Sequence, residues 1–260
     1  MKLVDSHSHL FLEDFQSDLP QVMMRAREAG VTHIFMPNID STTIEPMLKV
    51  CSEYKGYCFP MIGLHPTSVD AGYEKELAVV AGHLAMPDGY VAIGEIGLDY
   101  YYDLSEREVQ KSAFAKQIEL ADEAELPIAL HVRDAYEDTR KILFDMQKYI
   151  KNGLLLHCYS GSAEYVKIFD KLDAYYAFGG AITFKNAKHN LESLAVVPKD
   201  RLLLETDCPY MTPVPFRGKT NEPKYVSLVA QKAAQVLGVS EEEIADLTSK
   251  NAKRLFTRLK

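Results

Sequence analysis

The stretch PIALHVRDAYEDTRKILFDMQKYIKNGLLLH, residues 127–157, contains the repeating unit of this chain. It begins with a short apolar run (Pro127–His131), continues through a segment with helical spacing (Asp134–Tyr149) and returns to a second apolar run (Gly153–His157). Short apolar runs separated by a helix of this length are typical of parallel strands joined by helical crossovers. A histidine ends each run, so the same unit predicts polar side chains at the ends of its strands.

The same alternation continues along the rest of the chain. We expect strands in eight apolar runs: Lys2–Ser6, Val31–Met36, Cys58–Leu64, Tyr90–Ile96, Pro127–His131, Gly153–His157, Ala174–Phe178 and Leu202–Asp207. We expect helices in six segments: Ser17–Ala29, Ser105–Glu125, Asp134–Tyr149, Ser162–Leu172, Glu222–Leu237 and Ser240–Leu259. Two of these helices carry strong start signals, because Ser105 and Glu108 form a capping box and Ser240 is followed by three glutamates.

This order of elements predicts an α/β protein built as a (β/α)8 TIM barrel. We expect a single domain over residues 1–260, with the segment Ser240–Leu259 as an extra C-terminal helix, since barrels of this kind often reach this length undivided. An open doubly wound sheet is the alternative fold. The chain has neither a G-x-G-x-x-G motif nor a Walker A loop, which counts against that alternative.

Composition excludes some classes of function. The 260 residues are 47% hydrophobic and 25% charged, as in ordinary globular proteins, and the net charge is −8. The longest apolar stretches are much shorter than the roughly 20 residues of a membrane-spanning helix, and the first residues lack the pattern of a signal peptide. We therefore expect a cytoplasmic protein without a membrane partner. The acidic charge argues against a passive, non-specific DNA-binding protein, but not against an enzyme that meets phosphates locally.

Histidines and carboxylates follow the predicted strands at equivalent positions. Because the carboxyl ends of all barrel strands meet at one face, we expect these groups to converge there. They are His7, His9, Glu95, His131, His157 and Asp207. Imidazoles and carboxylates together suit divalent ions such as Zn, Mn, Fe, Co or Mg. Each group alone has a structural explanation, such as a buried histidine or an aspartate in a turn, so the metal interpretation depends on the whole set.

The spacing of these groups suggests two metal ions. One ion would lie on His7, His9 and Asp207, with Glu95 as a bridge, and the second on Glu95, His131 and His157. Two-metal sites activate a water molecule for hydrolysis. Glu95 and Asp207 are therefore the candidate catalytic residues, and Asp207 is the candidate to accept the proton of that water.

Other polar residues near the strand ends are candidates for secondary roles. We expect Glu205, two residues before Asp207, to point inward and orient a ligand histidine, although a structural ion pair is also consistent with the pattern. The candidates for substrate contacts are His65, Arg133, Arg217 and Asn221. Arg217 and Asn221 suit a phosphate, but the same segment could instead cap the following helix. The run Tyr100–Tyr102 suits base stacking, although core packing is the commoner role of such tyrosines.

The four cysteines, Cys51, Cys58, Cys158 and Cys208, form no C-x-x-C pair and are expected to be free thiols. Cys158 and Cys208 each follow a proposed ligand. By the alternation of side chains along a strand, we expect both to pack outside the barrel rather than bind metal.

Eight motifs occur in the order found in one known family: DSHSHL, GLHP, GEIGLDYY, LPIALHVRDA, LHCYSG, FGGAITFKNA, LLETDCPYMTP and FRGKTNEP. By these motifs the chain resembles the TatD-type metal-dependent deoxyribonucleases, a branch of the amidohydrolase superfamily. The resemblance implies a (β/α)8 barrel with two divalent ions (Mg, Mn or Zn) that hydrolyses DNA from a 3′ end, with single-stranded DNA as the expected partner. It also implies that His7, His9, Glu95, His131, His157 and Asp207 are the ligands.

Two alternatives remain open at this point. Some members of the family resemble D-aminoacyl-tRNA deacylases, and the motifs do not separate that ester chemistry, or the chemistry of a small-molecule amidohydrolase, from phosphodiester cleavage. A metal-binding regulatory protein with a decayed site is the alternative outside enzymes, and the complete ligand set argues against it.

Overall fold

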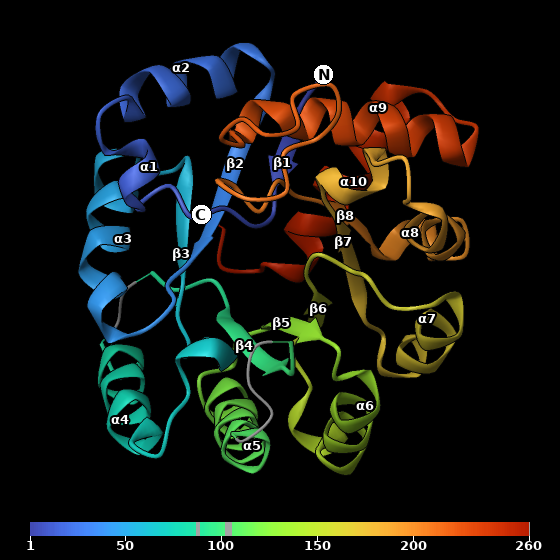
Figure 1. Cartoon of the computed structure of the whole chain (residues 1–260). Helices are drawn as coiled ribbons and strands as arrows, with labels where there is room; N and C mark the ends of the chain where they lie inside the picture. The colour runs from blue at the N-terminus through green and yellow to red at the C-terminus, as the bar shows by residue number, and fades with distance from the viewer. Residues whose placement is uncertain (87–88, 102–105, 260) are drawn as a thin grey trace.

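The computed structural model describes residues 1–86, 89–101 and 106–259. Parallel strands lie at the centre of the molecule and helices surround them (Figure 1). The strands are β1 (Leu3–Asp5), β2 (Val31–Pro37), β3 (Cys58–Met61), β4 (Ile93–Asp99), β5 (Ile128–Arg133), β6 (Leu154–Leu156), β7 (Tyr175–Phe178) and β8 (Leu202–Leu204). Each of the eight apolar runs in the sequence overlaps one of these strands, so the predicted strand order is confirmed.

The strands form two parallel sheets, β1-β2-β3 and β4 to β8 in sequence order, and two seams join them. At one seam, Ile62 after β3 forms a parallel bridge with Ile93 of β4. At the other, the amide of Ser6 after β1 donates to the carbonyl of Leu204 in β8, with 3.0 Å between nitrogen and oxygen. The predicted TIM-barrel-like arrangement is thereby confirmed, and all the strands point their carboxyl ends toward the same mouth.

Helices lie between successive strands and after the last strand (Figure 1). They are α1 (Glu13–Gln16), α2 (Leu19–Glu28), α3 (Ser41–Glu53), α4 (Tyr73–Leu84), α5 (Arg107–Glu123), α6 (Tyr136–Asp145), α7 (Ala163–Phe169), α8 (Lys188–Leu194), α9 (Val226–Leu237) and α10 (Glu241–Leu255). The six expected helical segments each contain one of them, whereas α1, α3, α4 and α8 lie in segments that the sequence pattern left unassigned. Within the described ranges, none of the helices combines the length and the apolar character needed to cross a membrane.

Side-chain caps begin some of these helices as the sequence predicts. The hydroxyl of Ser240 accepts a hydrogen bond from the amide of Glu243 at 3.1 Å, which starts α10. The expected capping box of α5 involves Ser105, which lies outside the described residues.

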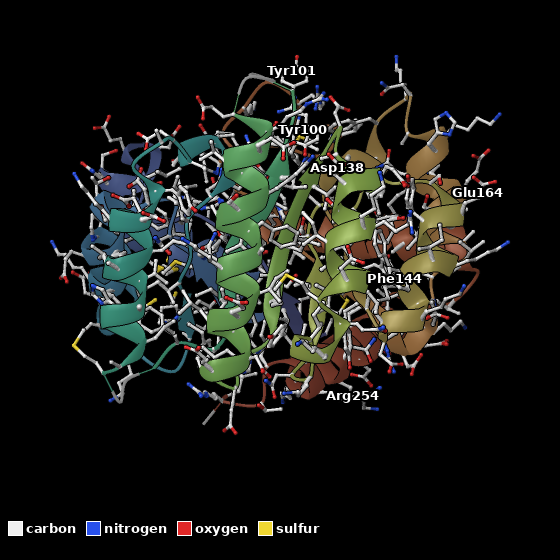
Figure 2. All side chains as sticks on the ribbon, turned by 90° about the horizontal axis from the view of Figure 1, so that it is seen from below. Tyr100, Tyr101, Asp138, Phe144, Glu164 and Arg254 are labelled. Carbon is white, nitrogen blue, oxygen red and sulfur yellow. The ribbon has the colours of Figure 1, made fainter. Side chains whose placement is uncertain are left out.

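The extra C-terminal helix α10 closes the end of the barrel opposite the mouth. Asn251 of α10 is fully buried and donates to the carbonyl oxygens of Lys199 and Leu202, both at 2.9 Å. The ring of Phe256, just after α10, stacks on Phe35 of β2 with 4.2 Å between centroids. Figure 2 shows the two ends, with Tyr101 at the mouth and Arg254 of α10 at the opposite end. The mouth therefore remains as the place where strand ends are open to a ligand.

Candidate metal centre

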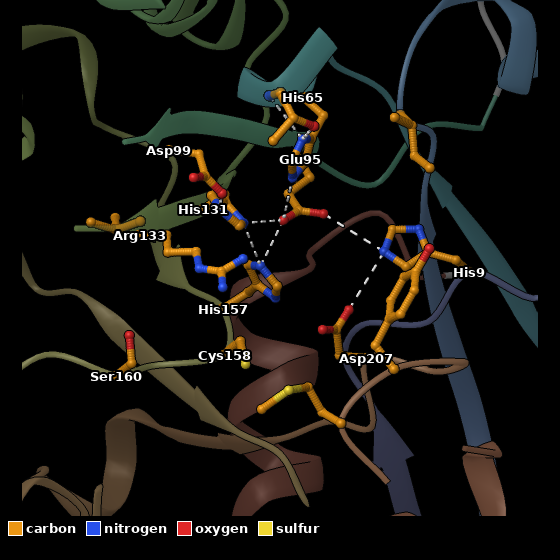
Figure 3. A pocket seen from close by; sticks show the side chains of 15 residues that line it. His9, His65, Glu95, Asp99, His131, Arg133, His157, Cys158, Ser160 and Asp207 are labelled. Atoms are coloured by element: carbon orange, nitrogen blue, oxygen red, sulfur yellow. Dashed lines mark hydrogen bonds and ion pairs between the residues drawn. The ribbon is translucent and has the colours of Figure 1, made fainter. Parts of the chain in front are cut away.

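The six residues that the sequence nominated as metal ligands lie together at the mouth of the barrel. Five of them, with His65 and Arg133, line a cavity of about 510 Å³ (Figure 3). His7 is fully buried and does not line it. The six come from different elements: His7 and His9 follow β1, Glu95 belongs to β4, His131 belongs to β5, His157 follows β6, and Asp207 follows β8.

Glu95 lies at the centre of this group. Its Oε2 is 3.0 Å from Nε2 of His7, and its Oε1 is 2.7 Å from both Nδ1 of His131 and Nε2 of His157. Burial raises the pKa of Glu95, but the charges of His157 and the other surrounding histidines outweigh burial and hold that pKa well below its usual value. Glu95 is therefore an ionised carboxylate with one oxygen turned toward each half of the cluster.

The first half contains His7, His9 and Asp207. Nδ1 of His9 lies 3.2 Å from the carbonyl oxygen of Pro37 and donates to it, which leaves the lone pair of the ring on Nε2. That Nε2 is 3.2 Å from Nε2 of His7 and 3.6 Å from Oδ1 of Asp207. Burial and the nearby His157 lower the pKa of His7, which favours the neutral ring. Neutral nitrogens and a carboxylate that face one another in this way match the donor set of a divalent cation.

The second half contains His131 and His157, and Asp99 supports it from behind. Oδ2 of Asp99 is 2.9 Å from Nε2 of His131, so this nitrogen carries the proton and the lone pair on Nδ1 points toward Glu95. The same Nδ1 is 3.3 Å from Nε2 of His157. The two nitrogens and the Oε1 of Glu95 thus lie within 3.3 Å of one another.

The sequence analysis missed Asp99, although a signal for it exists. Glu95, Gly97 and Asp99 alternate along β4, so their inner sides face the same way. Burial raises the pKa of Asp99, but hydrogen bonds from His131 and the amide of Tyr101 outweigh burial and keep that pKa below its usual value. The alternation along β4 therefore predicts that the Asp99 side chain points inward, where it could pair with a histidine.

Glu205 lies beneath the cluster, where the strand alternation of β8 places it. Its side chain is fully buried, and its Oε1 accepts a hydrogen bond of 2.6 Å from the amide of Cys158. The same oxygen is 3.6 Å from Nδ1 of His157. Burial lowers the pKa of His157, but the carboxylates of Glu95 and Glu205 outweigh burial and raise that pKa well above its usual value. This position is suited to orienting His157.

Asp5 ties together the two strand ends that carry the first half of the cluster. Its Oδ1 accepts hydrogen bonds from the amides of Thr206, at 2.8 Å, and His7, at 3.4 Å. The hydroxyl of Thr206 donates to its Oδ2. The sequence analysis assigned Asp5 no role, because its partner Thr206 is 201 residues away and no local pattern reveals that contact.

Cys158 corrects one of the sequence predictions. The backbone of Cys158 has φ 42°, in the left-handed region, so the alternation of β6 does not continue through it. Its side chain consequently lines the cavity instead of packing outside the barrel. Cys208 is buried, with its Sγ 2.8 Å from the hydroxyl of Ser8, as expected for a packed thiol. Asp207 also has a positive φ of 56°, a conformation that aspartate tolerates better than most residues.

The two halves of the predicted substrate set lie in different places. His65 and Arg133 line the cavity. Nδ1 of His65 accepts a hydrogen bond from the amide of Thr67 at 3.1 Å, so its Nε2 carries the proton and faces Oε1 of Glu95 at 3.2 Å. His65, Glu95 and His131 do present ligand atoms within 4.8 Å of one another. The tautomer of His65 nevertheless makes it a hydrogen-bond donor toward the cavity.

Arg217 and Asn221 lie outside the cavity lining. Arg217 is exposed, and its guanidinium carbon is 3.8 Å from the ring centroid of Phe184. Asn221 is fully buried, and its amide nitrogen donates to the carbonyl oxygens of Thr206 and Tyr210, at 2.7 and 2.6 Å. The expectation that Asn221 contacts a phosphate does not fit the structure, because its side chain is already committed to the backbone of the loop after β8.

The tyrosines that follow β4 differ in their burial. Tyr100 is buried, and its hydroxyl donates to Asp138 at 2.9 Å, so it belongs to the packing of the barrel wall. Tyr101 is exposed at the mouth, where the guanidinium carbon of Arg133 lies 3.6 Å from its ring centroid. Tyr102 lies outside the described residues.

Comparison with known proteins identifies the family of this chain. A family model described as TatD related DNase matches residues 4–257. The chain belongs to the TatD family. It is 44% identical over 254 residues to the uncharacterized metal-dependent hydrolase YabD of Bacillus subtilis, with 98% of each chain covered. It is 31% identical to the 3′-5′ ssDNA/RNA exonuclease TatD of Pantoea vagans, over 98% of this chain and 99% of the relative.

A solved structure shares the same architecture. The crystal structure of YJJV, a TatD homologue from Escherichia coli K12, matches with a TM-score of 0.89 and 29% identity, over 98% of both chains. The sequence-based assignment to the TatD family is thus confirmed, and the chain is a metal-dependent hydrolase of that family. The His and Glu clusters at its mouth could hold the metal on which such hydrolases depend.

Proposed function

We propose that this TatD-family hydrolase cleaves phosphodiester bonds at the 3′ end of single-stranded DNA, using two divalent ions held by His7, His9, Glu95, His131, His157 and Asp207. The bound ions would be Mg, Mn or Zn, which suit imidazole and carboxylate ligands. Two relatives with 31% and 32% identity carry the name 3′-5′ ssDNA/RNA exonuclease TatD, and this supports a nucleic acid substrate.

The position of Glu95 carries the proposal. One carboxylate oxygen faces His7 and the other faces His131 and His157, all within 3.0 Å. A carboxylate shared in this way is the usual bridge of a two-metal site. A single-metal site would leave one of the two histidine groups without a cation, at a substantial cost for buried polar atoms.

The residues of the cluster have complementary tasks in hydrolysis. Two ions held by these residues would polarise the phosphate and acidify a water molecule. Asp207 is ionised and has an oxygen 3.6 Å from His9, so it is placed to accept the proton of the attacking water. Burial raises the pKa of Asp207, but its interaction with His9 and the charges of the nearby histidines outweigh burial and keep that pKa below its usual value. Arg133 lines the cavity and is the donor for the phosphate oxygens, whereas the Nε2–H of His65 faces Oε1 of Glu95.

The test is a nuclease assay with metal-depleted protein. We expect a chelator to abolish shortening of a 5′-labelled single-stranded oligonucleotide, and added Mg or Mn to restore it. Asp207→Asn should lower kcat by about 10²–10⁴-fold, the usual contribution of a general base. Asp200→Asn, a carboxylate near the opposite end of the barrel, is the matched control and should keep wild-type activity.

Two results would contradict the proposal. Undiminished cleavage in excess chelator would remove the metal mechanism. An intact oligonucleotide together with cleavage of a D-aminoacyl-tRNA would keep the metal centre but move the substrate to the ester class.

A further inference from the structure

The mouth of the barrel carries exposed aromatic side chains. Of the large hydrophobic side chains that are exposed in the described part of the chain, the two aromatic ones are Tyr101 and Tyr210, with exposed fractions of 57% and 54%. Tyr101 follows β4 and Tyr210 follows β8, so both lie on loops at the carboxyl ends of the strands (Figure 2 shows Tyr101). Exposed apolar side chains that gather at the edge of a cavity are typical of a binding surface.

The cavity has chemically different sides. Ile39 follows β2, and Tyr210 and Met211 follow β8, the two strands that flank β1. These three side chains therefore form an apolar surface on the His9 side. Arg133 lines the opposite side, with its guanidinium over the ring of Tyr101. The proposed ligand residues lie between this apolar surface and the guanidinium of Arg133.

Tyr210 is held close to the proposed reaction centre. Its ring centroid is 6.3 Å from that of His9, with an angle of 65° between the rings. Its amide donates to the carbonyl of Asp207 at 2.9 Å, and its carbonyl accepts from the buried amide group of Asn221 at 2.6 Å. The backbone of this loop is therefore held by hydrogen bonds, while Tyr210 as a residue is 54% exposed.

We propose that Tyr210 is a stacking platform for the unpaired nucleobase next to the scissile phosphate, and that it is a specificity-determining residue. The inference rests on the proposed function. It names the part of the DNA 3′ end that the enzyme recognises, which is the unpaired base. A nucleotide has a flat apolar base and an anionic phosphate, which match the Tyr210 side and the Arg133 side. Stacking accepts any base, because every base has a π-face, but it requires that the face be free of a neighbouring base pair.

The experiment compares two single-stranded oligonucleotides that differ only in the 3′-terminal unit, which is an ordinary nucleotide in one and a stable abasic tetrahydrofuran residue in the other. The measured quantity is the ratio of kcat/KM for removal of the two terminal units. The wild-type enzyme should favour the ordinary end by about 5- to 150-fold, the usual contribution of one stacked base. Tyr210→Ala and Tyr210→Leu should reduce the ratio to near one, and Tyr210→Phe should preserve it.

Controls separate recognition from structural damage. Met24→Ala removes an exposed apolar side chain of α2 and should leave the ratio at its wild-type value. Metal content is measured in every variant. A wild-type ratio near one, or a Tyr210→Ala variant that loses metal and slows equally on both ends, would overturn the inference while leaving the nuclease proposal in place. Failure of the wild-type enzyme to cut either oligonucleotide would overturn the proposed function, and this inference with it.

Discussion

The two ends of the barrel differ in character although the same strands build both. Inside the closed end, the strands present apolar side chains, among them Ala129, Leu155, Ala177 and Leu203. Two residues further along the same strands, the inward positions hold His131, His157, Gly179 and Glu205. A step of two residues keeps the side chain on the same face of a strand, so core and site are successive layers of one interior.

Gly179 and Glu205 are neighbours within the polar layer. A Cβ atom at position 179 would lie 3.5 Å from the Cγ of Glu205 and 3.7 Å from its Oε1, which is ordinary van der Waals contact. The buried carboxylate therefore packs directly against the glycine. The comparison teaches that the apolar layer stabilises the barrel, while the polar layer is tolerated because its groups pair with one another.

Phe256→Ala should have the largest effect of the substitutions that separate the two ends. Phe256 is 1% exposed and stacks on Phe35 at the closed end, so removing its ring should lower the free energy of unfolding by about 3–5 kcal/mol. Denaturant unfolding measures this loss. At a temperature where the variant is folded, kcat and metal content should match the wild type. Loss of metal in the folded variant would show that the two ends are not independent.

Asp99→Asn should have an intermediate effect, confined to the mouth. Without the carboxylate that holds Nε2 of His131, the affinity for Mn should fall by about 10- to 100-fold. Calorimetric titration of metal-depleted protein measures the affinity. Asp138→Asn is the matched control, because Asp138 bonds to Tyr100 and Lys111 in the outer wall. Equal affinities in the two variants would contradict the role of Asp99.

Arg217→Ala should have the smallest effect. Arg217 is exposed on the loop after β8 and outside the cavity lining, so its loss should raise KM for the oligonucleotide by about two- to fivefold, as expected for one solvated charge. Arg254→Ala, at the opposite end of the barrel, should leave KM unchanged. An equal rise in both variants would point to the overall charge of the protein rather than to a contact at the mouth.

Some interactions at the mouth could not have been read from the sequence. Asp99 and His131 are 32 residues apart, and Asp5 and Thr206 are 201 residues apart. Each pair meets only because the barrel brings separate strand ends together. The position of Asn221 is similar, since its partners become clear only when the loop after β8 is folded.

The sequence alone determined the order of the strands, the position of six helices and the chemical types gathered at the strand ends, and its motifs identified the family. It could do so because hydrophobic periodicity is local and parallel strands place equivalent residues at one face. Only the tertiary structure decided which oxygen of Glu95 faces which histidine, that Cys158 turns into the cavity, that Asn221 turns away from it, and that Tyr210 stands at its edge. The outcomes for Cys158, Asn221 and Tyr210 depend on loop backbones beyond the last strand residue, where side-chain alternation no longer applies.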